Sequence, residues 1–327
     1  MSDQLLEVDD LRISFRSDGQ KAAAVDGVSF QVAAGETVGI VGESGSGKSL
    51  TALAIMGLLP TGGAEVSGHI RYDGQDLGSL SESARQRLRG NAMAMIFQEP
   101  ATALNPVFTI GEQIAEVFMQ HRRMPRREAL QQAIEMLKLV GIPAPERRLH
   151  DYPHQMSGGM RQRVMISMAI ACEPRLLIAD EPTTALDVTI QAQVLHLLRE
   201  LKGRLNLSVI LITHSLGVVA EFADRAIVMY AGKIVEDAQT ADLFAAPLHP
   251  YTKGLVASIP PIDEEIERLH AIPGAVPPLK DMPSGCRFHP RCSAAIEQCR
   301  RVDPPLREVG QRRRVACHLV SASQVLR

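Results

Sequence analysis

The sequence lacks the marks of three common classes of protein. No apolar run approaches the ~20 residues that a helix needs to cross a bilayer. The first residues, Met1-Ser2-Asp3-Gln4, contain neither the basic nor the apolar region of a signal peptide. Lysine and arginine total 35 against 37 aspartate and glutamate, so the net charge of −2 lacks the basic excess of many nucleic-acid-binding proteins. We therefore expect a chain that stays in the cytosol, crosses no membrane and binds no nucleic acid.

Cysteine is also scarce, and its distribution marks a boundary. The chain has five cysteines in 327 residues, and a cytosolic location does not favour a disulfide framework. Apolar residues make up 45% and charged residues 22%, which is typical of a globular chain of about two domains. Four of the five cysteines fall in the last 42 residues, and eleven of the 20 prolines lie between 247 and 305. The composition therefore predicts a boundary near 240–250.

The first 240 residues alternate between short apolar runs and helical patterns. Such runs, when continuous, are typical of strands buried on both faces of a largely parallel sheet. From about 100 to 163 the pattern is helical, which indicates a helical insertion. The predicted strands cover 38–41, 176–179, 209–213 and 226–229, and a helix is predicted over 50–56.

A glycine-rich loop joins the first of these strands to that helix. Its residues fit the pattern G-x-x-x-x-G-K-[ST], whose backbone N–H groups and helix N-terminus bind phosphate oxygens. Lys48 is then expected to reach the β- and γ-phosphates of a nucleotide, and the Ser49 hydroxyl to bind Mg²⁺. The predicted phosphate loop comprises Gly42, Glu43, Ser44, Gly45, Ser46, Gly47, Lys48 and Ser49.

Two carboxylates follow the strand predicted over 176–179. In a phosphate-loop ATPase, an acidic motif at such a strand end serves Mg²⁺ and the attacking water. We expect Asp180 to hold the Mg²⁺ shell and Glu181 to orient or deprotonate the water.

A further motif resembles the signature of the ABC-transporter ATPases. It runs Ser157-Gly158-Gly159-Met160-Arg161-Gln162-Arg163 and precedes the acidic strand at about the usual distance. Other family landmarks occur in the family's order. Gln98 in Phe97-Gln98-Glu99-Pro100 resembles the Q-loop, Asp187 closes a D-loop-like Thr184-Ala185-Leu186-Asp187, and His214 resembles the switch histidine.

The resemblance implies an α/β phosphate-loop NTPase core and a role for each landmark. Ser157, Gly158 and Gly159 would close on the γ-phosphate held by a sister ATPase subunit. Gln98 would sense Mg²⁺ and touch a membrane subunit, His214 would contact the γ-phosphate, and Phe15 would stack on adenine. The implied partners are two transmembrane permeases, a sister ABC ATPase and, indirectly, a solute-binding protein. The implied location is peripheral, on the cytoplasmic face of the inner membrane.

The last 80 residues resemble the C-terminal extension of oligopeptide and dipeptide importer ATPases. The similar segments are His249–Leu255, 272–278 and 285–292. The domains implied are an ATPase domain over 1–244, with a helical subdomain over about 99–163, and the extension over 245–327. Prolines at this density predict a loop-dominated extension.

The four C-terminal cysteines are spaced C-x5-C-x6-C-x17-C. A loop-rich segment gains stability from a metal that ties thiolates together. Four cysteine ligands suit zinc or an iron–sulfur cluster, and free thiols are the remaining alternative. The resemblance favours a [4Fe-4S] cluster, since some relatives with this extension hold one. The ligands would be Cys286, Cys292, Cys299 and Cys317.

The resemblance predicts the ATP-hydrolysing subunit of a membrane importer for di- or oligopeptides, with ATP and Mg²⁺ as cofactors. The alternatives are an importer of nickel or another small solute, and a soluble ABC ATPase acting on nucleic acid or the ribosome. A non-hydrolysing regulatory subunit is disfavoured because Lys48, Asp180, Glu181 and His214 are all present. Ser215 replaces the usual Asp after His214, which affects the local hydrogen bonding of that loop. The run Arg312-Arg313-Arg314 is expected to form a solvated face.

Overall fold

The computed structural model describes residues 4–17, 20–60, 62–184, 186–259, 271–310 and 312–320. The chain divides into two compact units. Unit 1 comprises Met1–Leu5, Ala33–Glu36 and Ser79–Ile210, and unit 2 comprises Leu6–Val32, Thr37–Gly78 and Leu211–Arg327. The phosphate loop and the C-terminal extension both belong to unit 2, and the acidic strand end and the signature motif belong to unit 1.

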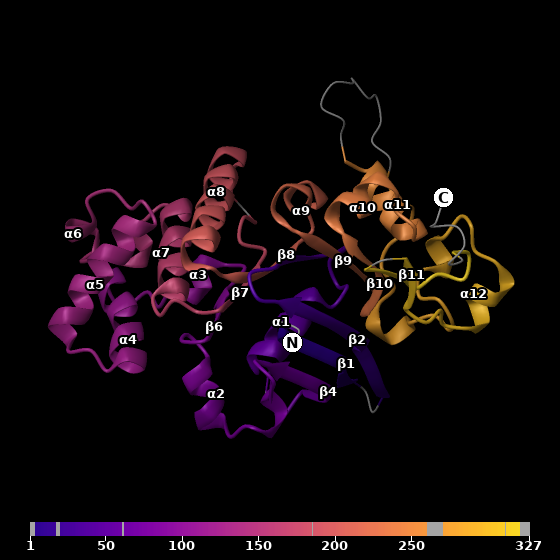
Figure 1. Cartoon of the computed structure of the whole chain (residues 1–327), viewed down its shortest axis with the longest axis horizontal. Helices are drawn as coiled ribbons and strands as arrows, with labels where there is room; N and C mark the ends of the chain where they lie inside the picture. Colours follow the sequence, from indigo (N-terminus) through magenta and orange to yellow (C-terminus); the bar gives the residue numbers. More distant parts are fainter. Residues whose placement is uncertain are drawn as a thin grey trace. The chain divides into compact units, whose positions relative to one another are not determined.

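Unit 1 consists mainly of helices, which gather around α7 (Figure 1). Strands β6 and β7 pair in parallel, with Ile96 opposite Ala179, and both are fully buried. The region predicted to be helical contains α3 to α7 and no strand between β6 and β7, as expected. The elements are α2 (Glu82–Leu88), β6 (Met93–Ile96), α3 (Pro100–Ala103), α4 (Ile110–Arg122), α5 (Arg126–Leu139), α6 (Pro145–Arg148), η2 (Pro153–Gln155), α7 (Gly158–Ile170), β7 (Leu176–Asp180) and α8 (Val188–Leu205).

Local sequence signals define where these helices begin. The Thr109 hydroxyl accepts from the N–H of Glu112, whose carboxylate accepts from the N–H of Thr109, so α4 begins with a capping box. Ser157 caps α7 and Asp187 caps α8 without a capping box, each through a side-chain oxygen that accepts a backbone N–H. The helices then pack through buried aliphatic side chains, among them Ile114, Ala133 and Val164.

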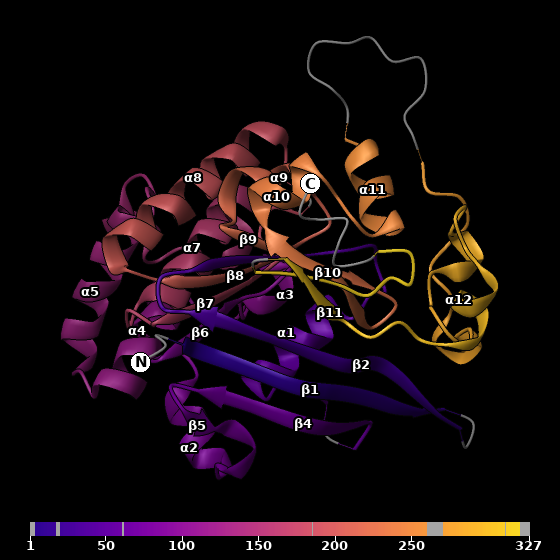
Figure 2. The ribbon, with the colours of Figure 1, turned by 45° about the vertical axis from the view of Figure 1, so that its right-hand side comes forward.

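One sheet of unit 2 is antiparallel, with the strand order β2-β1-β4-β5. Its three long strands run side by side in Figure 2, and Ile13 of β1 lies opposite Val66 of β4. In β1 the side chains of Leu6, Val8, Leu11 and Ile13 are buried, whereas Asp9 and Arg12 are exposed and flank a bulge. The strands are β1 (Gln4–Ser17), β2 (Gln20–Ala33), β4 (Ala64–Tyr72) and β5 (Gln75–Asp76).

A second run of strands in unit 2 has the order β11-β12-β10-β9-β3. The pair β3–β9 is parallel, and the other pairs are antiparallel. The remaining elements of this unit are mostly short. The strands are β3 (Thr37–Val41), β9 (Arg225–Tyr230), β10 (Lys233–Gln239), β11 (Arg307–Gly310) and β12 (Arg313–Val315); β8 (Ser208–Thr213) ends in this unit. The helices are α1 (Lys48–Met56), η1 (Leu77–Ser79), α9 (Leu216–Phe222), α10 (Thr240–Ala245), α11 (Pro250–Ala257), η3 (Leu279–Asp281), η4 (His289–Arg291) and α12 (Glu297–Arg301).

The strands and helices predicted from apolar runs are confirmed by β3, α1, β7, β8 and β9. The long antiparallel strands β1, β2 and β4 were not predicted, because their alternating pattern is weaker than a continuous apolar run. No helix among the residues that the structure describes is both long and apolar enough to span a membrane.

The extension is dominated by loops, as its prolines predict, and its helices and strands are short. It contributes β11 and β12 to the sheet beside β10, and α11 and α12 lie in the same part of the chain (Figure 1). The expectation of a solvated arginine face over 312–314 is wrong for two of the three residues. Arg313 is buried against Glu236 and Arg314 pairs with Asp237, because β12 places them beside β10.

Candidate nucleotide site

The phosphate loop lies between β3 and α1 in unit 2, as the motif requires. Gly42 permits a close approach of two backbone segments: a Cβ there would lie 2.2 Å from the carbonyl oxygen of Met229. The carbonyl of Ser46 accepts a hydrogen bond of 3.0 Å from the N–H of Gly232. The loop is therefore held against the turn that follows β9, and side chains larger than glycine cannot occupy position 42 without moving it.

The side chain of Lys48 lies inside the phosphate loop and links several of its residues. Its ammonium group donates to the carbonyls of Gly42 and Glu43 at 2.8 and 3.0 Å and to the Ser46 hydroxyl at 3.3 Å. The side chain is 5% exposed. A buried, hydrogen-bonded cation at the start of a helix suits an anionic ligand.

The acidic motif of unit 1 sits at the end of β7. Asp180 is the last residue of the strand and is 5% exposed. The Glu181 carboxylate accepts from the Gln98 amide at 3.1 Å and from the Thr184 hydroxyl at 2.8 Å. The structure thus brings together Gln98 and Glu181, two residues assigned separately from the sequence and 83 positions apart.

Glu181 has a strained backbone. Its φ is 46°, in the left-handed region that a residue with a Cβ rarely adopts. Strain of this kind concentrates at functional sites, where the surrounding structure fixes it. Here a hydrogen bond of 3.1 Å from the N–H of Thr184 to the Glu181 carbonyl closes the turn. The carboxylate is held in one place by both its backbone and its side-chain partners.

The signature and D-loop residues meet within unit 1. Ser157 precedes α7 and accepts from the N–H of Met160, so Gly158 and Gly159 form the first turn of that helix. A Cβ on Gly159 would lie 2.9 Å from Ile190 of α8. Asp187 caps α8 through the N–H of Ile190 at 2.9 Å. The D-loop residue Ala185 lies outside the described residues.

The remaining predicted site residues lie in unit 2. His214 follows β8 and is exposed, and Phe15 is a half-buried residue of β1 opposite Ala64. Ser215 caps α9, with its hydroxyl 3.5 Å from the N–H of Val218, and its own N–H donates to the Thr213 hydroxyl at 3.0 Å. Serine therefore supplies the helix cap at the position where the resemblance predicts aspartate.

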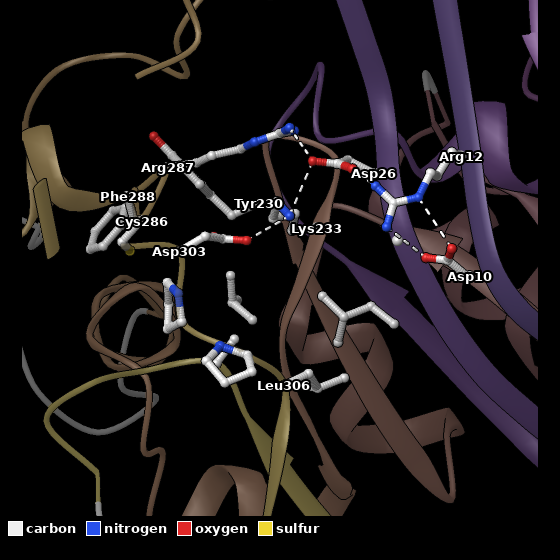
Figure 3. Close-up of a pocket in the computed structure, with 16 residues that line it drawn as sticks. Asp10, Arg12, Asp26, Tyr230, Lys233, Cys286, Arg287, Phe288, Asp303 and Leu306 are labelled. Atoms are coloured by element: carbon white, nitrogen blue, oxygen red, sulfur yellow. Dashed lines mark hydrogen bonds and ion pairs between the residues drawn. The ribbon is translucent and has the colours of Figure 1, made fainter. Parts of the chain in front are cut away.

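The extension reaches the phosphate-loop region through arginines that the sequence did not single out. The carboxylate of Asp26 receives Arg287 at 2.6 Å and Lys233 at 3.1 Å beside a cavity of about 190 Å³ (Figure 3). Burial alone would raise the pKa of Asp26, but the hydrogen bond from Lys233 and the nearby cations outweigh it and lower that pKa. Arg291 pairs with Glu43 of the loop at 3.0 Å. Isolated arginines in a loop-rich sequence carry no local signal of their partners.

The four C-terminal cysteines are free thiols that lie near one another. The N–H of Cys286 donates to the carbonyl of Cys299 at 2.8 Å. The pKa of Cys286 is raised to about 11, mainly by burial and further by the neighbouring thiols Cys299, Cys317 and Cys292. The four groups therefore lie within electrostatic range of one another.

The structure does not support a site in which the predicted cysteine ligands bind a single metal ion. Within the described ranges, no group of three or more His, Cys, Asp or Glu residues is arranged so that it could hold a metal ion. The thiols gather, but not as a ready set of ligands to one ion. Cys172, expected to be an inert buried thiol, is buried, and burial raises its pKa.

Comparison with known proteins covers nearly the whole chain. Residues 25–184 match the family model described as ABC transporter, and residues 235–299 match the oligopeptide/dipeptide transporter C-terminal region. The chain is 54% identical to the oligopeptide transport ATP-binding protein AppD of Bacillus subtilis, covering 96% of each chain. It is 50% identical to the dipeptide transport ATP-binding protein DppD of Escherichia coli, again over 96% of each.

Solved structures agree with the fold. A dimeric ATP-binding cassette in a post-hydrolysis state, bound to ADP and phosphate, superposes with a TM-score of 0.64 at 27% identity over 72% of this chain and 98% of that one. The cbiO1 protein of Clostridium perfringens, part of an ABC transporter complex, gives 0.63 at 26% identity over 74% and 91%. The chain therefore belongs to the ATP-binding ATPases of ABC transporters, in the branch that carries the oligopeptide/dipeptide transporter C-terminal region.

Proposed function

We propose that this ATPase is the energy-coupling subunit of an importer whose cargo is di- or oligopeptides. The observation that carries the proposal is the identity of 50–54% over almost the full length, extension included, with proteins named for oligopeptide and dipeptide transport. The complete set of nucleotide-binding and hydrolytic residues supports an active role in the cycle. A regulatory subunit without hydrolysis would not need Glu181 held by two hydrogen bonds.

The phosphate loop is the proposed binding site for ATP and Mg²⁺, and its chemistry fits them. The loop offers a buried ammonium group, backbone N–H groups at the start of α1 and the Ser49 hydroxyl. When bound, Mg²⁺ neutralises charge on the phosphate oxygens. Lys48 binds phosphate, Ser49 and Asp180 are the magnesium ligands, and the other loop residues (Gly42, Glu43, Ser44, Gly45, Ser46 and Gly47) bind through their backbone.

Glu181 is the general base of the proposed hydrolysis. Its carboxylate takes a proton from the attacking water, and the hydrogen bonds from Gln98 and Thr184 orient it. Gln98 has a second role, as a magnesium sensor that reports to the membrane subunit. His214 contacts the γ-phosphate and Phe15 stacks on adenine.

The proposed assembly contains a sister ATPase. Ser157, Gly158, Gly159 and Asp187 serve the nucleotide held by that sister. The N-terminal turn of α7 supports this role, because it combines a serine hydroxyl with N–H groups at a helix start. Two permeases and, indirectly, a solute-binding protein complete the importer, with this chain peripheral on the cytoplasmic face of the membrane.

The domain limits proposed are 1–244 for the ATPase domain, with its helical subdomain over about 99–163, and 245–327 for the extension. The change in composition near 245 and the helices α3 to α7 support these limits.

The extension is proposed to hold a [4Fe-4S] cluster on Cys286, Cys292, Cys299 and Cys317. Two points support this proposal: the neighbouring thiols all affect the pKa of Cys286, and four cysteine thiolates are the usual ligands of such a cluster. Iron, sulfide and zinc are measured in protein purified without oxygen. About four irons and four sulfides per chain support the cluster. One zinc, or no metal in a folded protein, contradicts it.

The cargo is tested in cells that lack the gene for this chain. Uptake of labelled di- and oligopeptides should be lost, restored by the wild-type gene, and not restored by the Glu181→Gln variant. Radioactive nickel is measured in parallel. Loss of nickel uptake with intact peptide uptake would overturn the peptide assignment while leaving the ATPase in place.

A further inference from the structure

Glu43 is the residue of the phosphate loop that the extension holds most closely. Its backbone N–H donates to the Tyr251 hydroxyl at 2.9 Å, and its carboxylate receives Arg291 Nη1 at 3.1 and 3.0 Å. Its carbonyl accepts from Lys48 at 3.0 Å. The N–H, the carbonyl and the side chain of one loop residue are thus all engaged, two of them by the extension.

Arg291 is fixed in the direction of Glu43. Its Nε donates to the carbonyl of Pro273 at 2.8 Å and its Nη2 to the carbonyl of Ile272 at 3.3 Å. The guanidinium also lies 5.7 Å from the centre of the Tyr230 ring. Only 6% of the side chain is exposed. Because two edges of the planar fork are used by backbone carbonyls, the remaining nitrogen points at the loop carboxylate.

The surrounding aromatic rings make this support rigid. Tyr230 from the end of β9, Tyr251 from α11 and Phe288 from the extension contact one another, with ring centres 4.8 to 5.4 Å apart. Burial raises the pKa of Tyr251, so its hydroxyl stays protonated and neutral beside the loop. The N–H of Glu43 therefore always meets a neutral acceptor in a well-packed environment.

The same segment also contacts the turn that holds the phosphate loop. Arg287 donates to the carbonyl of Ala231, and the next residue, Gly232, donates its N–H to the Ser46 carbonyl at 3.0 Å. Arg287 and Arg291 both lie between Cys286 and Cys292. One short segment of the extension thus contacts the phosphate loop directly at Glu43 and is linked to Ser46 through the turn at Ala231 and Gly232.

The negative charge of Glu43 suggests how Arg291 affects nucleotide binding. A carboxylate in a loop that binds triphosphate opposes its ligand, and a buried guanidinium bound to that carboxylate offsets the repulsion. We infer that Arg291 of the extension is a positioning residue for ATP: it neutralises Glu43 and, with Tyr251, fixes the phosphate loop. This inference rests on the proposed use of the loop for ATP.

The test is a charge-rescue experiment on the full chain. Binding of a fluorescent ATP analogue is measured, together with KM and kcat for ATP in the assembled transporter. Arg291→Gln should raise the Kd and the KM about three- to tenfold and leave kcat within about twofold, since the unpaired carboxylate opposes binding and not chemistry. The double variant Glu43→Gln/Arg291→Gln should return both constants to within about twofold of wild type.

Two further variants separate positioning from a general structural effect. Arg301→Gln removes an arginine of the same extension that pairs with Glu297 on the exposed surface, and it should change nothing. Arg291→Lys keeps the charge but loses the fork, so an intermediate Kd is expected. It replaces Arg291→Gln should that variant fail to fold. A folded Arg291→Gln protein with wild-type affinity, or a double variant as weak as the single one, overturns the inference. Failure of the wild-type chain to bind ATP would instead overturn the proposed function.

Discussion

Carboxylates are held differently in two regions of the molecule. One region is the proposed catalytic edge of unit 1, formed by Gln98, Glu181 and Thr184, and the other is the extension in unit 2. At the catalytic edge, Glu181 is partly exposed, has a strained backbone and is held by neutral partners, Gln98 and Thr184. In the extension, four arginines each pair with a carboxylate of the preceding residues. These pairs are Arg287 with Asp26, Arg291 with Glu43, Arg313 with Glu236 and Arg314 with Asp237.

This difference distinguishes a carboxylate that is proposed to react from carboxylates that attach the extension to the rest of the chain. A carboxylate that must accept a proton cannot be permanently neutralised, so neutral hydrogen-bond donors orient it. Carboxylates that are buried and serve no reaction need a cation, because an unpaired buried charge is costly. The comparison predicts that substitutions at the catalytic edge change turnover, whereas substitutions at the arginine pairs change stability or ligand affinity.

The largest effect is expected for Glu181→Gln. It removes the general base but keeps an acceptor for Gln98 and Thr184, so hydrolysis by the assembled transporter should fall about 10²- to 10⁴-fold while ATP binding and the unfolding temperature stay near wild type. The matched control is Glu200→Gln on α8, an exposed carboxylate whose partner is His196. Unchanged hydrolysis in Glu181→Gln would contradict the assignment of the base.

Arg313→Met should have the largest effect on stability. Among the residues that the structure describes, the carboxylate of Glu236, which is 0% exposed, then keeps only the backbone N–H groups of Leu248 and His249 as partners. We expect a loss of about 3 kcal/mol in the free energy of unfolding, measured by urea denaturation. The double variant Glu236→Gln/Arg313→Met should recover part of it. If Arg313→Met lowers kcat of the folded transporter as strongly as Glu181→Gln, the arginine pairs also affect turnover and the two regions do not differ in this way.

His249 should make the attachment of the extension sensitive to acid. The ring is fully buried, and burial lowers its pKa to about 3. The unfolded chain binds a proton below about pH 6.5 that the folded chain does not bind, so stability is present above that pH and is lost as the pH falls toward 3. Between pH 7 and pH 5 the loss should be about 2 kcal/mol.

The variant His249→Asn isolates this effect. His249 Nδ1 accepts from the N–H of Tyr251 at the start of α11, and an asparagine can supply the same cap without titrating. Its unfolding free energy should depend less on pH between 7 and 5 than that of wild type. Identical pH profiles for the two proteins would exclude His249 as the source.

The smallest effect is expected beside His214. Ser215→Ala removes the side-chain cap of α9, whose hydrogen bond is long at 3.5 Å, so about 0.5 kcal/mol of stability should be lost. Ser215→Asp, which restores a cap, serves as the control. Both variants should hydrolyse ATP within about twofold of wild type. A large loss of turnover in Ser215→Ala alone would assign the cap a role in placing His214.

Much of the nucleotide site could be predicted because its signals are local. A glycine-rich loop, a strand that ends in Asp180 and Glu181, and a serine that starts a helix each occupy a few consecutive residues. Their geometry follows from backbone N–H groups and helix starts. The contact between Gln98 and Glu181 was not predicted, since it depends on how β6 and β7 pair.

The loop-rich character of the extension was predicted, but its pairing with the sheet was not. Its prolines indicated loops, yet β11 and β12 join the sheet beside β10, because a short strand can pair with an existing edge despite a weak pattern of its own. The cysteines were identified from spacing, but the structure shows a gathering of thiols and no ready single-ion site in its described part.

By itself, the sequence predicted the chemistry of the candidate site: a phosphate loop, a proposed general base and a signature helix, each encoded in one short segment. Only the tertiary structure decided which carboxylates the arginines of the extension pair with. Arg291 and Glu43 are 248 positions apart, and Arg313 and Glu236 are 77 apart. An arginine can pair with any of the 37 acidic residues of the chain. The partner is selected when folding buries both charges together, where an unpaired carboxylate would cost more than the pair.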